Sequence, residues 1–126
     1  MKVIMINGSP NEKGCTFTGL SIIKEQLLKH GVESVIFQVG KDPIRGCTAC
    51  YSCKKGSTKG RCVFDDDMVN TVADEFSRAD GLILGTAVHY ASVAGAATSF
   101  FDRMFFSQEA SKRRLKFGAA IVSCRE

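Results

Sequence analysis

Four of the six cysteines in this 126-residue chain fall within the glycine- and lysine-rich segment 44–63. They have the spacing C-x2-C-x2-C-x8-C and are Cys47, Cys50, Cys53 and Cys62. Thiolates three residues apart along a turn can converge on one soft centre, and iron–sulfur clusters are held by four cysteines with such gaps. Zinc is a competing metal, although its sites usually show separated C-x2-C pairs. The spacing alone leaves three interpretations open: an iron–sulfur cluster, a zinc ion, or free thiols that pack the loop.

A second candidate for chemistry is the polar segment that follows the first predicted strand, from Asn7 to Thr18. It contains glycines and the hydroxyls of Ser9, Thr16 and Thr18, and it leads into a predicted helix. Because a helix N-terminus presents unpaired N–H groups, this arrangement favours a bound phosphate. The segment lacks the GK[ST] ending of a Walker loop, the triple-glycine spacing of the dinucleotide motif and a C-x5-R phosphatase loop.

Short apolar strands alternate with amphipathic helices along the chain. We predict strands at 3–6, 34–39, 81–86 and 117–123, and helices at 17–28, 65–76 and 100–106. Asp65, Asp66 and Asp67 are expected to cap the second helix through its dipole. Strands that alternate with helices indicate βαβ units and a parallel sheet, here in a single α/β domain over residues 1–126.

The parallel sheet predicts where ligands would bind. The carboxyl ends of parallel strands lie at one edge of the sheet, and ligands bind there, where the strand order reverses. Three segments leave such ends, at 7–18, 86–94 and 123–126. The polar loop after the first strand is therefore expected to lie beside the segments that follow the third and fourth strands.

Composition and charge limit the possible partners. The hydrophobic content of 44%, the charged content of 24% and the net charge of +4 are those of an ordinary globular protein. The apolar start is too short for a signal peptide, so we expect a cytoplasmic location with reduced or ligating cysteines. Basic residues cluster at 54–61 and 112–116 and could steer a phosphorylated cofactor or an acidic protein. No nucleic-acid motif and no membrane-spanning run is present, so neither partner is expected.

Three motifs together resemble the NADPH-dependent FMN reductase family, and within it the iron–sulfur flavoproteins. They are the G-S-P-x3-G-x-T loop at 8–16, the cysteine segment that continues through 62–68, and the run T-A-V-H-Y at 86–90 followed by F-D-R at 101–103. The resemblance covers essentially the whole chain, in the order and spacing of the family. A match of three motifs is more specific than any one of them.

The resemblance implies a flavodoxin-like, doubly wound parallel sheet with strand order 2-1-3-4 that binds FMN. It implies that the phosphate is held by Ser9, Asn11, Cys15 and Thr16. The flavin would be lined by Thr86, Ala87, Val88, His89, Tyr90 and Ala91, and approached from its other side by Ser123 and Cys124. NAD(P)H would be the co-substrate, a quinone, flavin or similar small molecule the acceptor, and no catalytic acid or base is required.

The resemblance to the iron–sulfur flavoproteins also implies an alternative. The four clustered cysteines would hold a [4Fe-4S] cluster that exchanges electrons with a ferredoxin-like protein. The fifth strand and last helix of the family are missing from this chain. The chain is then either a truncated, non-catalytic binding module or a homo-oligomer in which a neighbouring subunit covers the sheet edge, with the aromatic residues at 100–106 at the contact.

Overall fold

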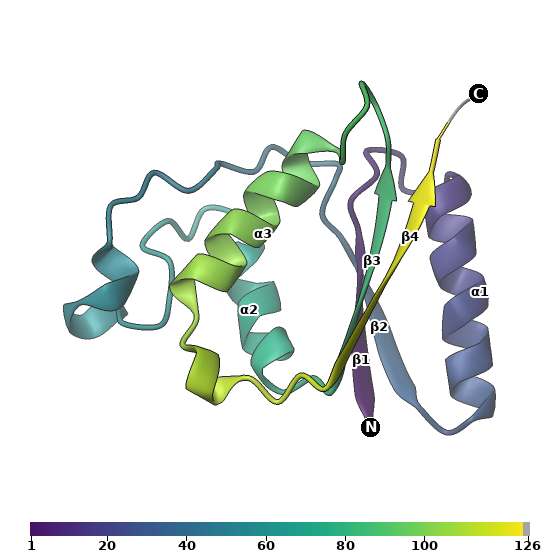
Figure 1. The fold of residues 1–126 in the computed structure, drawn as a ribbon, viewed down its shortest axis with the longest axis horizontal. Coiled ribbons are helices and arrows are strands. Elements are labelled where there is room, and N and C mark those ends of the chain that lie inside the picture. The colour runs from purple at the N-terminus through teal and green to yellow at the C-terminus, as the bar shows by residue number, and fades with distance from the viewer. Residues whose placement is uncertain (125–126) are drawn as a thin grey trace.

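A four-stranded parallel sheet lies between helices in the computed structural model, which describes residues 1–124 (Figure 1). The strands have the order β2-β1-β3-β4 and are β1 (Lys2–Asn7), β2 (Glu33–Gln38), β3 (Gly81–Ala87) and β4 (Phe117–Ser123). The α-helices are α1 (Cys15–Lys29), α2 (Val69–Ser77) and α3 (Gly95–Ser107). Three 3-10 turns are η1 (Ser52–Lys54), η2 (Gly56–Thr58) and η3 (Ala110–Lys112). The predicted fold class and strand order are confirmed.

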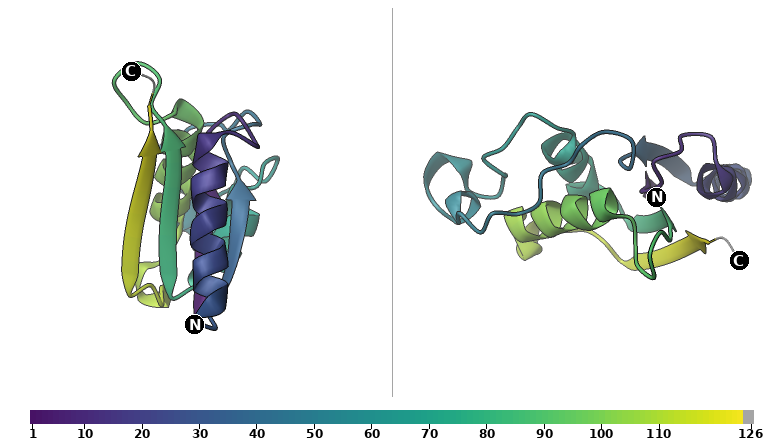
Figure 2. Two further views of the ribbon diagram at one scale, coloured as in Figure 1. Left: turned by 90° about the vertical axis from the view of Figure 1, so that its right-hand side faces the viewer. Right: turned by 90° about the horizontal axis from the view of Figure 1, so that it is seen from above.

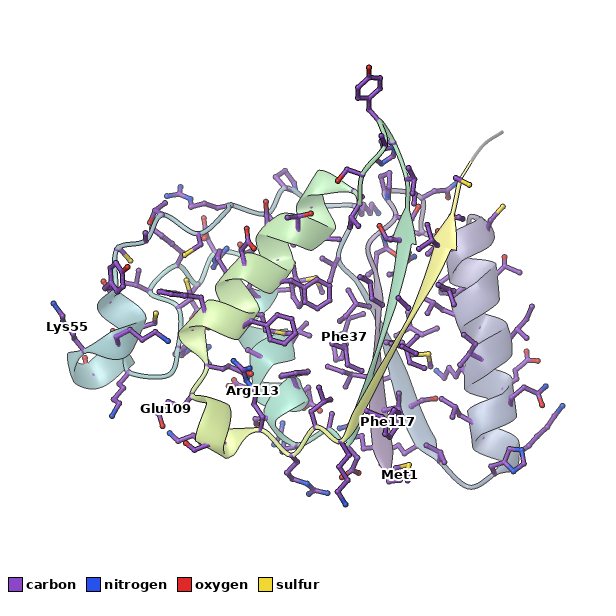
Figure 3. The ribbon with its side chains drawn as sticks, in the orientation of Figure 1. Met1, Phe37, Lys55, Glu109, Arg113 and Phe117 are labelled. Carbon is purple, nitrogen blue, oxygen red and sulfur yellow. The ribbon has the colours of Figure 1, made fainter. Side chains whose placement is uncertain are left out.

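The central strand β1 is buried on both faces, which explains its continuous apolar sequence. Val3 and Met5 pack with α1 on one side, whereas Ile4 and Ile6 pack with α2 and α3 on the other. The two views of Figure 2 show α1 alone on its face of the sheet and the other two helices on the opposite face. Phe37 of β2 lies on the side of α2 and α3, where it packs against their apolar cluster (Figure 3).

Two predicted helix starts are wrong. We expected the second helix to begin at the aspartates, but α2 begins at Val69. The Asp67 carboxylate does accept the Val69 N–H at 3.0 Å, so one of the three acids contributes to the helix start as expected. α3 begins at Gly95, five residues before the first large apolar residue of the predicted helix. Its first turn is made of small residues, which carry little periodic signal.

The surplus aromatic residues of α3 contact other parts of the same chain. Phe105 meets Phe76 of α2 edge-on with 5.6 Å between ring centroids, and Phe106 meets Tyr51 of the cysteine segment edge-on, also at 5.6 Å. The Lys54 ammonium lies 4.6 Å from the Phe106 ring centroid. These contacts tie the cysteine segment to α3, so the aromatic surplus does not by itself require a second subunit.

No helix in residues 1–124 has the length and the apolar character needed to cross a membrane.

Asp80 joins three strands at the edge of the sheet opposite the strand exits. Its carboxylate accepts the Lys2 N–H and the Arg114 guanidinium, each at 2.8 Å, and its carbonyl accepts the Lys116 N–H at 2.8 Å. The Lys2 N–H and then the Arg114 guanidinium lower the pKa of Asp80 below its ordinary value. The ionised carboxylate is therefore favoured in the folded chain over the unfolded one.

This shift predicts an acid-sensitive contribution to stability. A lowered folded pKa stabilises the fold fully above about pH 5, and this stabilisation is lost as the pH falls through the folded pKa. Asp80→Asn should therefore lower the free energy of unfolding at pH 7, and the difference from wild type should shrink toward pH 3. Urea unfolding across this range measures both curves. Asp102→Asn, at an exposed position, is the control, and parallel curves for Asp80→Asn and wild type would contradict the prediction.

Candidate functional site

A pocket of about 580 Å³ opens where β1, β3 and β4 end. Three segments far apart in the sequence line it: the loop after β1 with the first turn of α1, the residues after β3, and the end of β4. The lining residues are Ser9, Pro10, Asn11, Gly14, Cys15, Thr16, Ala87, Val88, His89, Ser123 and Cys124. The expected meeting of the strand exits is therefore present. Pro10 and Gly14 were not among the predicted site residues, because neither has a polar side chain and they line the pocket only through their shape and backbone.

The loop after β1 is held by hydrogen bonds from neighbouring strands. The Gly8 N–H donates to the Gly85 carbonyl at 2.7 Å, and the buried Asn7 side chain accepts the Ser9 N–H at 3.1 Å. Gln38 at the end of β2 donates to the Ser9 carbonyl at 2.8 Å. The Ser9 hydroxyl accepts the Asn11 N–H at 3.2 Å. The loop thus has a fixed shape before any ligand binds.

The first turn of α1 faces this pocket with free donors. Within the described residues, no side chain caps the helix, and its first turn contains no acid. Cys15 and Thr16 stand at the first positions of a 15-residue helix, where backbone N–H groups have no partner inside the helix. Such an end attracts an anion through both its donors and its dipole. The pocket therefore offers a place for a phosphate group.

α1 is directly linked to the end of β4. The hydroxyls of Thr16 and Ser123 lie 2.7 Å apart, across 107 positions of sequence. Thr16 is buried, Ser123 is half-buried, and Cys15 and Cys124 are exposed at the pocket. Residues 125–126 of the predicted 123–126 segment lie outside the described residues.

Three predicted flavin contacts lie outside this pocket. Thr86 is buried and bonds to its own strand end, where its hydroxyl donates to the Ala87 carbonyl at 2.9 Å. Val88 bridges Val93, and this tight loop exposes 97% of Tyr90. Ala91, the next residue, has a φ of 55°. The flavin contacts assigned to Thr86, Tyr90 and Ala91 stay predictions.

The four clustered cysteines line a different, small cavity of about 20 Å³, against α3. Cys53 is buried and Cys62 half-buried, whereas Cys47 and Cys50 are exposed. Among residues 1–124, however, no group of three or more cysteine, histidine or acidic side chains is arranged to hold a metal ion. The four cysteines therefore line one small cavity, but their side chains are not arranged to hold a metal ion.

The backbone of the cysteine segment has an unusual conformation. Ala49 and Tyr51 have φ values of 53° and 58°, in the left-handed region that residues with a Cβ rarely adopt. Residues held in this way cluster at functional sites.

The surroundings of two of the thiols shift their pKa in opposite directions. A hydrogen bond with the Ser52 side chain is the largest cause of a lowered pKa at Cys50, whereas burial raises the pKa of Cys53.

The donor set matches an iron–sulfur cluster in type and number. In a [4Fe-4S] cube each thiolate binds a different iron, so the four sulfurs surround a volume instead of meeting at one point. The consecutive two-residue gaps of the first three cysteines favour this cluster over zinc, whose sites usually show separated C-x2-C pairs. The cysteine segment thus matches the cluster in the type and number of its donors, and the four side chains would have to move together to hold it.

Sequence reasoning missed the side chains that anchor the cysteine segment. Asn70 is 1% exposed, and its amide accepts the Cys62 N–H at 3.0 Å and donates to the Cys62 carbonyl at 2.9 Å. Arg103 of the F-D-R run forms its ion pair with Asp67 and not with the adjacent Asp102. Asp67, which we expected to cap the second helix, therefore also binds Arg103, a role that sequence reasoning did not assign.

The fold and the pocket at its strand exits define a flavodoxin-like α/β domain. The sequence profile of the family described as NADPH-dependent FMN reductase matches residues 1–125. The chain belongs to this family.

Curated relatives with the name iron–sulfur flavoprotein are similar to the chain. One from Methanocaldococcus jannaschii is 36% identical over 106 residues, which are 82% of this chain and 50% of the relative. One from Archaeoglobus fulgidus is 32% identical over 126 residues, which are 97% of this chain and 54% of the relative. The chain thus spans about half the length of these relatives.

A solved structure supports the fold. The NAD(P)H:quinone oxidoreductase from Methanothermobacter marburgensis superposes with a TM-score of 0.73 at 14% identity, over 98% of this chain and 66% of that one.

Proposed function

We propose that this chain forms the FMN-binding part of an oxidoreductase that takes electrons from NAD(P)H and passes them to a quinone, a flavin or a similar acceptor. The observation that carries the proposal is the pocket in which the free N-terminus of α1 faces the exits of β3 and β4. Membership of the FMN reductase family supports the same cofactor.

Each part of the pocket has a distinct task in this proposal. The N–H groups at the start of α1, with Ser9, Asn11 and Thr16, would bind the phosphate. Backbone after β3 and the end of β4 would orient the ring and exclude water from it. Bound FMN supplies reversible uptake of a hydride or of single electrons. No side chain has to transfer a proton in that exchange.

Thr16→Val tests the phosphate site, since it keeps the shape of the side chain and removes its hydroxyl. Hydrogen bonds to charged groups contribute about 1.5–3 kcal/mol, so we expect FMN binding to weaken about tenfold or more. Quenching of flavin fluorescence during titration measures the affinity. Thr18→Val, two residues later on the exposed side of α1, should bind FMN as wild type does. Equal affinity of Thr16→Val and wild type would remove Thr16 from the site.

A second candidate is an electron carrier of the iron–sulfur flavoprotein kind. The specific observation in its favour is the four cysteines around one cavity, and the names of the relatives agree with it. In this candidate Cys47, Cys50, Cys53 and Cys62 would hold a [4Fe-4S] cluster, and a ferredoxin-like protein would be the redox partner. The two candidates share the FMN site and differ in the cysteine segment.

Cys53→Ser separates the two candidates. If a cluster is present, protein purified without oxygen should contain about four iron per chain, and this variant should lose most of it. FMN affinity should stay within about twofold, because Cys53 lies outside the FMN pocket. Iron and flavin quantification measures both. Cys124→Ser, at an exposed cysteine outside the cluster, is the matched control and should retain its iron.

Wild-type protein that binds FMN but contains no iron would support the reductase and exclude the iron–sulfur electron carrier. Protein that binds neither would leave a non-catalytic binding module. A homo-oligomer and a cytoplasmic location stay predictions.

A further inference from the structure

Arg103 of α3 is a buried cation whose contacts all lie in the segment around the cysteines. Its side chain is 1% exposed. The Nε–H donates to the Cys62 sulfur at 3.3 Å, and Nη2 donates to the Phe64 carbonyl at 2.7 Å. Nη1 donates to the Arg45 carbonyl at 3.3 Å and to the Asp67 carboxylate. The guanidinium therefore has acceptors in several directions at once.

These acceptors belong to both ends of the cysteine segment. Arg45 lies two residues before Cys47, and Phe64 lies two residues after Cys62. One side chain on a helix thus joins the beginning and the end of a loop whose middle projects away from the sheet (Figure 1). Lys55 lies at the outer end of this projection (Figure 3). The clamp thus fixes both ends of the cysteine segment.

The contact of Arg103 with Cys62 acts mainly as a directed hydrogen bond and less through the charge of the guanidinium. The Asp67 carboxylate compensates much of the guanidinium charge at longer range, so Cys62 receives mainly an N–H aimed at its sulfur. A hydrogen bond of this kind stabilises negative charge on sulfur, and hydrogen bonds to sulfur are among the factors that set the reduction potential of iron–sulfur clusters. A lysine could not replace the planar fork, because its ammonium cannot bridge these acceptors in the same geometry.

We infer that Arg103 is a positioning residue that holds Cys62 as the fourth cluster ligand and raises the reduction potential of the cluster through its N–H···S contact. This inference rests on the iron–sulfur candidate described above. It assigns to a buried arginine, which is not itself a ligand, both the placement of one ligand and part of the electronic tuning.

Arg103→Lys tests this inference with three measurements. Deuterium uptake in the apoprotein should rise about tenfold in peptides covering 44–53 and 60–67, and stay unchanged in β1 and α1. Iron per chain after anaerobic reconstitution should fall by at least half. The midpoint potential of the remaining cluster should become more negative, by about 59 mV for a tenfold change in the equilibrium constant of one-electron reduction.

The matched control is Arg114→Lys, which changes another ion-paired arginine, far in sequence from the four clustered cysteines. Its exchange, iron content and potential should equal those of wild type. If Arg103→Lys fails to fold, Asp67→Asn releases the guanidinium while keeping the side-chain size. It should then raise deuterium exchange and lower iron content, each by a smaller amount than Arg103→Lys does.

Two results would overturn the inference in distinguishable ways. A wild-type protein that takes up no iron would remove the cluster, and with it the iron–sulfur candidate. A wild-type protein with four iron, beside an Arg103→Lys variant with unchanged iron and potential, would leave the iron–sulfur candidate standing and reduce Arg103 to a structural clamp. Faster exchange without a change in potential leads to that same second conclusion.

Discussion

Gly40→Ala is expected to lower the free energy of unfolding by about 3 kcal/mol and to weaken FMN binding at least tenfold. Gly40 follows β2 and lies against the backbone of the loop after β1. A Cβ at this position would meet the Gly8 carbonyl oxygen at 2.2 Å and the Ser9 carbonyl oxygen at 2.4 Å. Backbone atoms cannot rotate away as a side chain can, so the loop that carries Ser9 must move. Urea unfolding and FMN titration measure the two effects.

Gly118→Ala is the matched control for this change. Gly118 lies in β4, and the nearest atom that its Cβ would meet is the Leu82 carbonyl oxygen at 3.8 Å, an ordinary contact. Its stability should stay within about 0.5 kcal/mol of wild type, and its FMN affinity should be unchanged. A Gly40→Ala variant as stable as Gly118→Ala would show that the loop after β1 tolerates displacement.

Asn70→Ala is expected to destabilise the protein by about 3 kcal/mol and to release the end of the cysteine segment. The substitution leaves the Cys62 N–H and the Cys62 and Phe64 carbonyls without the amide that now bonds them. Because Asn70 is 1% exposed, water cannot readily replace it. Thermal unfolding and deuterium exchange of peptides covering 60–67 measure the two effects.

Asn70→Asp and Thr71→Ala complete this test. The aspartate keeps the shape and the acceptor for Cys62 N–H, but it places a second carboxylate near Asp65 and loses the amide donors, so it should not restore stability. Thr71→Ala, at the exposed neighbouring position of α2, should behave as wild type. Wild-type exchange rates in Asn70→Ala would contradict the anchoring role.

The sheet and the location of the pocket could be predicted because they depend on local pattern and on topology. A strand buried on both faces must be continuously apolar, as Val3 to Ile6 are, and parallel strands must end at one edge. This places Ser9 and Thr16 beside Val88 and Ser123, as observed around the pocket. Their role toward FMN is a prediction, which FMN titration of Thr16→Val tests.

The contacts of the cysteine segment could not be predicted, because they join positions far apart in sequence. Asp102 and Arg103 are adjacent, but successive residues of a helix point about 100° apart, so neighbours rarely pair. The partner of Arg103 is Asp67, 36 positions away. The exposure of Tyr90 was not predictable either, because it follows from the bridge between Val88 and Val93, which forms a narrow loop and turns Tyr90 outward.

The cysteine segment is attached to the domain by side chains of α2 and α3 and contributes no strand to the sheet (Figure 1). Such an attachment makes the segment a replaceable appendage: its length and its cysteines can change during evolution while the flavodoxin scaffold keeps its hydrogen-bonded ladder. Evolution could therefore add or remove a metal site by changing about twenty positions, while the pocket at the strand exits stays unchanged.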